Sequence, residues 1–89
     1  MHELTHKEQE CLGDCNFFNV QHCMTRGFQA VIPNAVMVIS QALKSIQERY
    51  GTRADYLQVF TYVSVGVPLT KIYAVHDGEH VVFMLADEY

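Results

Sequence analysis

Positive charge is scarce in this chain of 89 residues, where six Lys and Arg stand against ten Asp and Glu. The formal net charge is −4, and the six basic residues are scattered along the sequence. A protein that grips nucleic acid by its phosphates needs basic side chains gathered in one patch. The scarcity therefore argues against direct nucleic-acid binding, and the acidic balance favours solubility or a basic protein partner.

Long apolar runs are also missing. No stretch approaches the roughly 20 apolar residues of a membrane-spanning helix. The amino terminus has no basic segment followed by an apolar one, as a secretory signal would. The three cysteines, an odd number, fit reduced thiols better than a disulfide framework. These absences predict a cytoplasmic protein with no membrane partner, and the shortness of the chain favours a bacterial host cell.

Motifs for catalysis are absent as well. The sequence contains no glycine-rich phosphate loop, dinucleotide fingerprint, nucleophile elbow or oxyanion loop. A nucleophilic Cys–His pair would lack a third residue to orient it. We therefore expect no enzymatic activity, no catalytic residue and no cofactor.

The chain does contain enough apolar material for one small folded domain. Hydrophobic residues make up 49% and charged residues 18% of the sequence, which excludes a disordered chain. Residues 1–16 are polar and lack sustained periodicity, so we expect a tail or a short helical arm there. Residues 17–89 are predicted to form a single α+β domain.

Turn chemistry predicts a β-hairpin in the last third of the chain. Asp77-Gly78 lies between two apolar, β-branched runs, and a two-residue Asp-Gly loop favours a type I′ turn. This turn pairs His76 with Glu79 and Ile72 with Phe83. One face of the hairpin then belongs to the core and carries Ile72, Ala74, Val81, Phe83 and Leu85. The other face carries Lys71, Tyr73, Val75, His80, Val82 and Met84.

The same register separates the two histidines near the turn. His76 and His80 are predicted to point to opposite faces of the hairpin, so they cannot share a ligand. We interpret His76 and Glu79 as an ordinary exposed cross-strand pair.

An amphipathic helix is predicted upstream of the hairpin. Pro33 suits the first turn of a helix and Gly51 its end, and apolar residues recur between them at steps of three and four. The expected elements are a strand at 17–24, a turn or bulge at 25–27, the helix at 33–50 and a strand at 55–65 that ends at Gly66-Val67-Pro68. The order β-α-β-β-β predicts a small antiparallel sheet of about four strands with one helix packed on one face.

A single helix leaves the other face of such a sheet open. In the strand at 55–65 we assign Leu57, Val59 and Val63 to the covered face. The opposite face is predicted to carry a large apolar patch made of Tyr56, Phe60, Tyr62, Tyr73, Val75, Val82 and Met84. The amino-terminal arm with Phe17 or Phe18, a second copy of the chain, or a different protein would cover it.

Thiol and imidazole groups are dense in the first 23 residues. Cys11 and Cys15 could lie on one face of a helix, and His22 or Cys23 could complete a zinc site. The spacing is not that of paired zinc ligands, so we assign no metal site and interpret these groups as idle or buried thiols and solvated histidines. A zinc-dependent regulatory module is the alternative.

Several strings of the sequence resemble a known family. They are Thr25-Arg26-Gly27, Ile32-Pro33, Asp55-Tyr56-Leu57-Gln58-Val59-Phe60, Lys71-Ile72, Asp77-Gly78-Glu79 and Met84-Leu85-Ala86-Asp87-Glu88-Tyr89. Over residues 24–89 the chain resembles the domain-of-unknown-function family 960, small proteins encoded by phages, prophages and mobile elements of Gram-positive bacteria. The segment 1–23 and the short connection at 64–70 depart from the family pattern. The resemblance implies a mobile-element origin and carries over no catalytic residues.

Together these features predict a non-enzymatic protein-binding module of a phage or mobile element. In its sharpest form it inhibits a host defence protein, as an anti-CRISPR protein binds a Cas nuclease. The alternative is a structural protein that associates with itself as a homodimer. The partner surface is predicted to join acidic side chains, suited to a basic groove, with aromatic contact area. Its residues are Tyr56, Phe60, Tyr62, Tyr73, Asp77, Glu79, Asp87 and Glu88.

Overall fold

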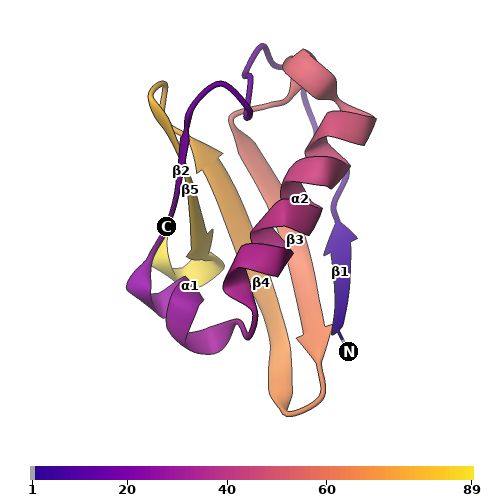
Figure 1. The fold of residues 1–89 in the computed structure, drawn as a ribbon. Coiled ribbons are helices and arrows are strands. Elements are labelled where there is room, and N and C mark those ends of the chain that lie inside the picture. The colour runs from indigo at the N-terminus through magenta and orange to yellow at the C-terminus, as the bar shows by residue number, and fades with distance from the viewer. Residues whose placement is uncertain (1) are drawn as a thin grey trace.

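The computed structural model describes residues 2–89 and shows one five-stranded sheet with two helices on the same face (Figure 1). The strand order across the sheet is β1-β3-β4-β5-β2. The elements are β1 (His2–His6), β2 (Gln21–Met24), α1 (Arg26–Val31), α2 (Ala35–Arg49), β3 (Leu57–Ser64), β4 (Val67–His76) and β5 (His80–Leu85). Two short 3-10 turns, Gly51–Arg53 and Ala86–Glu88, follow α2 and β5.

The predicted α+β class is confirmed, but the sheet has five strands instead of about four. The additional strand is β1, where we expected a tail or helical arm; Met1, also assigned to that arm, lies outside the described residues. β1 pairs antiparallel with β3 and places Leu4 opposite Tyr62. Burial alternates along its five residues, which is the period of a strand. The alternation is short and only Leu4 in it is aliphatic, so the sequence pattern alone does not indicate a strand.

The predicted first strand at 17–24 is shorter in the structure. Only Gln21–Met24 form β2, while Phe17 leaves the sheet plane and is fully buried in the core. β2 pairs with β5 in the parallel sense, so the sheet is mostly but not wholly antiparallel. A parallel neighbour requires a long crossover connection, and the helices together with β3 and β4 supply it.

The predicted helix at 33–50 is α2, Ala35–Arg49. Its end is as expected, because Gly51 follows the last turn with a φ of 59°. Its start is not, since Pro33 precedes the helix and Asn34 caps it in a left-handed conformation. A second helix, α1, replaces the turn expected at 25–27: Thr25 is its N-cap and its hydroxyl accepts a hydrogen bond of 3.1 Å from the Phe28 amide.

The β4–β5 hairpin forms where Asp77-Gly78 predicts it, but with a register shifted by two residues. His76 lies opposite Val81 and Ile72 opposite Leu85, so the predicted partners Glu79 and Phe83 are wrong. Asp77 does not take the positive φ of a type I′ turn; its carboxylate instead accepts from the amides of Glu79 and His80 at 2.9 and 2.7 Å. A shift of two preserves the faces of both strands.

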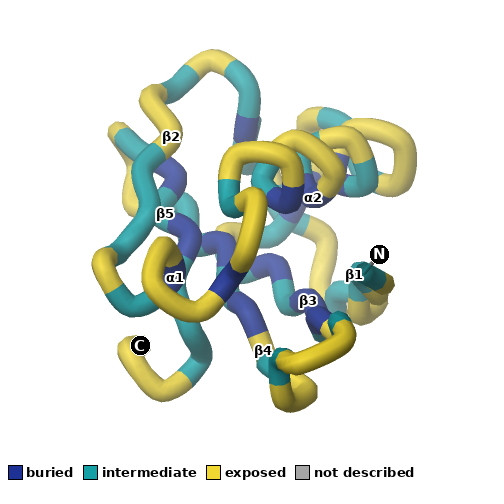
Figure 2. The backbone as a smooth tube through the Cα atoms, turned by 60° about the horizontal axis from the view of Figure 1, so that its bottom comes forward, coloured by how far each residue is buried: buried dark blue, intermediate teal, exposed yellow. Residues whose placement is uncertain are grey.

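The core lies between the helices and one face of the sheet, where Figure 2 shows the buried residues gathered. α1 contributes Phe28, whose ring lies 6.1 Å from that of Phe83 on β5. α2 contributes Val38, Ala42 and Ile46. The other buried hydrophobic residues are Phe17, Ile32, Ala54, Phe60, Tyr62, Ile72, Ala74 and Val81.

The face assignment of β3 was inverted in our prediction. Phe60 and Tyr62 are 0% and 1% exposed and point into the core, so their placement on the open surface is wrong. Leu57, Val59 and Val63 lie on the open face instead. Both faces of β3 are apolar, and aromatic side chains remove more area from water than Val or Leu, which outweighs the need to bury Gln58 between them.

Candidate functional site

The face of the sheet opposite the helices carries two apolar rows that run across the strands. Leu57 pairs with Val75, and Val75 pairs with Val82. Val59 pairs with Tyr73, and Tyr73 pairs with Met84 in the same way. All six side chains are half-buried, and both helices pack on the other side. We call this surface, Leu57, Val59, Tyr73, Val75, Val82 and Met84, the open face.

Three tyrosines meet at the open face. The Tyr73 and Tyr89 rings pack edge to face at 5.4 Å. Hydrogen bonding with the Tyr89 side chain raises the pKa of Tyr56. Tyr56 and Tyr89 remain 48% and 61% exposed. The structure therefore brings the predicted residues Tyr56 and Tyr73 together and adds Tyr89, which our prediction omitted.

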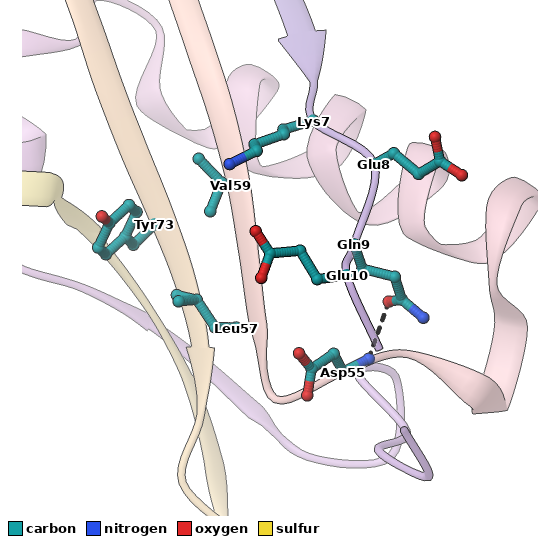
Figure 3. A pocket seen from close by; sticks show the side chains of 8 residues that line it. All are labelled: Lys7, Glu8, Gln9, Glu10, Asp55, Leu57, Val59 and Tyr73. Atoms are coloured by element: carbon teal, nitrogen blue, oxygen red, sulfur yellow. Dashed lines mark hydrogen bonds between the residues drawn. The ribbon is translucent and has the colours of Figure 1, made fainter. Parts of the chain in front are cut away.

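A cavity of about 200 Å³ opens beside these rows, between the start of β3 and the segment that follows β1 (Figure 3). Leu57, Val59 and Tyr73 form its apolar wall. Its polar wall consists of Lys7, Glu8, Gln9, Glu10 and Asp55. The polar wall carries three carboxylates and one ammonium group, so this edge of the open face is acidic.

The β4–β5 loop extends the acidic edge. The His76 amide donates to the Tyr56 carbonyl at 2.8 Å, which holds the loop beside Asp55 at the start of β3. Asp77 and Glu79 are exposed in this loop. Hydrogen bonds from the Glu79 and His80 amides lower the pKa of Asp77, so its carboxylate is ionised at neutral pH. We call Glu10, Asp55, Asp77 and Glu79 the acidic edge.

The other two predicted acidic residues lie elsewhere. β5 separates the loop with Asp77 from the turn that holds Asp87 and Glu88. Asp87 is exposed there, but Glu88 accepts hydrogen bonds from the Thr25 hydroxyl and the Leu85 amide at 2.6 and 2.8 Å. The four carboxylates therefore do not form one patch, and that of Glu88 is engaged within the chain.

The histidines of the hairpin have separate roles. His76 Nδ1 accepts from the Gly78 amide at 3.1 Å, so its Nε2 carries the proton and donates to the Asn16 carbonyl at 3.0 Å. Its predicted pairing with Glu79 is replaced by these bonds. His80 Nδ1 instead lies 3.8 Å from the Asp77 carboxylate.

The thiols near the amino terminus are free and do not gather. Cys11 is exposed, Cys15 pairs through its backbone with Ala54, and Cys23 is in β2. His22 Nε2 bonds to the Phe17 carbonyl at 2.5 Å. Within residues 2–89 no three side chains of His, Cys, Asp or Glu are placed to hold a metal ion. The described geometry therefore gives the zinc alternative no support.

A polar cluster that our prediction did not contain lies on the helix side, between β1 and α2. The ring of His6 stacks on Phe60 at 4.2 Å and meets Tyr50 edge-on at 5.6 Å. Its Nδ1 lies 2.6 Å from the Ser45 hydroxyl and its Nε2 lies 2.8 Å from Oε1 of the buried Gln58. With Gln9, these residues form what we call the His6 network.

Backbone groups determine every orientation in the His6 network. The Asp55 amide donates to Gln9 Oε1 at 2.9 Å, and Gln9 Nε2 donates to the Arg53 carbonyl at 3.1 Å. Gln58 must then donate through Nε2 to Gln9 Oε1 and to the Asp55 carbonyl, at 2.8 and 3.1 Å. Its Oε1 faces His6, so His6 Nε2 carries the proton and Nδ1 accepts from the Ser45 hydroxyl.

The environment keeps the His6 ring neutral. Burial lowers its pKa, the hydrogen bond to Gln58 opposes this effect, and the charge of Arg49 adds to the lowering. Arg49 also donates to the His6 carbonyl at 2.7 Å. One signal in the sequence pointed to this cluster: Gln58 stands in the same strand face as Phe60 and Tyr62, where a polar residue needs partners.

The chain matches no family model, no curated protein and no solved structure. Neither helix of the described chain is long and apolar enough to cross a membrane.

Proposed function

We propose that this protein is a binding module that holds a basic protein partner on its open face. The observation that carries the proposal is the pair of apolar rows, Leu57–Val75–Val82 and Val59–Tyr73–Met84, on the face that no helix covers. Contiguous apolar surface of this kind marks an interaction site in soluble proteins. Tyr56 and Tyr73 supply the aromatic contact area from which interfaces draw much of their energy.

The acidic edge supports a basic partner over a neutral one. Glu10, Asp55, Asp77 and Glu79 border the open face beside the row Leu57–Val75–Val82. Their charge speeds encounter with a basic surface and disfavours acidic competitors. The net charge of −4 acts in the same direction over longer distances.

In its narrower form, the proposal makes the partner a nuclease of the host's defence, such as a Cas nuclease. The acidic edge would then occupy the basic groove that otherwise receives nucleic acid. The phage-like resemblance of residues 24–89 favours this form. Titration of the protein into a nuclease cleavage reaction tests it: inhibition complete at one equivalent is expected, and undiminished cleavage at high excess would reject the narrower form alone.

A site-specific photo-crosslinker tests the broader proposal. One variant carries the crosslinking residue at Val59 on the open face, and a matched variant carries it at Gln47, which is exposed on α2. In host cells we expect an adduct with a basic protein from position 59 and none from position 47. Adducts only from position 47 would contradict the proposal, and adducts with a second copy of the chain would establish self-association instead.

Association rates measured with the purified partner then test the contribution of the acidic edge. Combined replacement of Asp77→Asn and Glu79→Gln should slow association and weaken its dependence on salt, because screening acts on these charges. The control is Glu48→Gln on the exposed side of α2, which should change neither the association rate nor its salt dependence. Equal rates for the charge variant and the wild type would exclude a contribution from the acidic edge.

A further inference from the structure

The His6 network places a neutral imidazole against a serine hydroxyl at the wall of a cavity. His2, Glu3, Leu4, His6, Gln41, Ser45 and Phe60 line this cavity, whose volume is about 320 Å³. Ser45 is half-buried and lines this cavity. A base within hydrogen-bond reach, itself oriented by a third group, is the arrangement that activates a serine nucleophile.

Gln58 occupies the place of the third group. In serine hydrolases an amide there usually costs about 10⁴-fold in rate, because it leaves the histidine in the wrong tautomer. Here both amide hydrogens of Gln58 are taken, by Gln9 and by the Asp55 carbonyl. Only its Oε1 is left for His6 Nε2, so the unprotonated Nδ1 faces the Ser45 hydroxyl. Gln58 is therefore a positioning residue with the orientation that the chemistry requires.

We propose that Ser45 is a nucleophile activated by His6 and that it hydrolyses short, uncharged carboxylic esters. Ser45 Oγ attacks the ester carbonyl carbon while His6 Nδ1 takes the hydroxyl proton. The bond to the alcohol breaks, and the alcohol leaves with that proton. Water then attacks the acyl-serine, again giving its proton to His6, and the carboxylic acid departs as Ser45 recovers its hydrogen. The sum is ester plus water to acid plus alcohol, with no oxidant or reductant.

The cavity determines the class of ester. Leu4 offers an apolar wall for a short acyl chain, and the net charge of −4 disfavours anionic substrates. Gln41 lies one helical turn before Ser45 on α2 and accepts from His2 Nε2 at 2.6 Å. Its amide NH₂ group has no hydrogen-bond partner among the described residues, so it is the donor available to the developing oxyanion.

This activity departs from our expectation of a non-enzymatic chain, which rested on the absence of a nucleophile motif. His6 and Ser45 are 39 residues apart and meet only across β1 and α2. It is also independent of the proposed binding function, because the cavity lies on the helix side of the sheet. Failure of either proposal leaves the other intact.

Two measurements test the assignment: hydrolysis of p-nitrophenyl acetate, and labelling by a fluorophosphonate with mapping of the modified peptide. We expect a single adduct on Ser45. The wild-type protein should hydrolyse the ester at least about 100-fold faster than background, and Ser45→Ala should fall to background. The matched control is Ser40→Ala, which is exposed on the same helix and should retain the full rate. The wild-type rate should rise with pH and reach half its maximum below pH 6.5, as the lowered pKa of His6 requires.

Two results would overturn the proposal. One is hydrolysis by Ser45→Ala at the wild-type rate, which would assign the activity to other groups such as surface imidazoles. The other is fluorophosphonate labelling that is absent or falls on a different residue. The labelling uses the wild-type protein, so it decides the question even where a variant folds poorly.

Discussion

The Thr25 hydroxyl donates a hydrogen bond of 2.6 Å to the Glu88 carboxylate, across 63 residues of sequence. The same hydroxyl accepts from the Phe28 amide and so caps α1. Glu88 in turn accepts from the Leu85 amide at the end of β5. The start of α1 and the segment after β5 therefore meet at one carboxylate.

Glu88→Gln should lower the melting temperature at neutral pH. The hydrogen bond from Thr25, together with those from the Leu85 and Gly27 amides, lowers the pKa of Glu88 below its ordinary value of 4.5. A lowered pKa in the folded state stabilises the fold above pH 4.5, and this contribution is lost as the pH falls through the folded-state value. Thermal melts of both proteins from pH 7 to pH 2 should therefore converge at the acidic end. A constant difference across that range would contradict the assignment.

Phe60→Ala should reduce the free energy of unfolding by about 3–5 kcal/mol, because it opens a cavity in the core. Val59→Ala is the matched control one residue away on the open face, and it should cost about 1 kcal/mol or less. Urea denaturation of the two variants measures both values. Equal losses would mean that the faces of β3 are wrongly assigned in the structure.

Gln58→Leu should cost about 1–3 kcal/mol although leucine has a similar volume, because it leaves the proton of His6 Nε2 without its hydrogen-bond acceptor. Gln47→Leu, exposed on α2, should stay within about 0.5 kcal/mol of the wild type. Denaturant unfolding at pH 7.5 makes the comparison. An unchanged free energy of unfolding in Gln58→Leu would show that the His6 network contributes nothing to stability.

Acidification below pH 6.5 should destabilise the protein through His6. Its pKa is lowered in the folded state, so the unfolded chain takes up the proton first. The stability is complete above pH 6.5 and declines as the pH falls toward the folded-state value. His6→Asn should flatten this decline, as measured by urea unfolding at pH 8, 6.5 and 5. An identical slope in the variant would assign the effect to other groups.

Tyr89→Phe should lower the pKa of Tyr56 toward its ordinary value of 10, because the hydrogen bond to the Tyr89 side chain is the largest cause of its rise. The Tyr73–Tyr89 ring contact should survive, since the aromatic ring remains. Titration by nuclear magnetic resonance measures the Tyr56 pKa and also reports on the Tyr73–Tyr89 ring contact. An unchanged Tyr56 pKa would show that the Tyr89 hydroxyl does not interact with the Tyr56 hydroxyl.

Local chemistry predicted several elements well. Asp77-Gly78 located the hairpin, and Gly51 marked the end of α2, because both signals depend on residues adjacent in sequence. The hairpin register failed for a local reason too: the Asp77 carboxylate bonds to the amides that follow it and stabilises a longer loop than Asp-Gly alone favours.

Features that depend on distant partners could not be predicted in this way. β3 has apolar residues on both faces, so its alternation fits either orientation, and only the fit of Phe60 and Tyr62 under α2 selects one. The His6 network joins residues up to 52 positions apart, and nothing in a local pattern connects them. The open face was foreseen from β4 and β5, whose faces survive the shift of two residues.

The strand order β1-β3-β4-β5-β2 also bears on how the chain comes to fold. Both edge strands lie in the first 24 residues, and the three strands between them follow residue 56. On the ribosome, β1 and β2 therefore emerge before either has anything to pair with. β1 must wait for β3 and β2 must wait for β5, so both early strands stay unpaired and exposed to proteases and chaperones while the helices between them and their partners are synthesised.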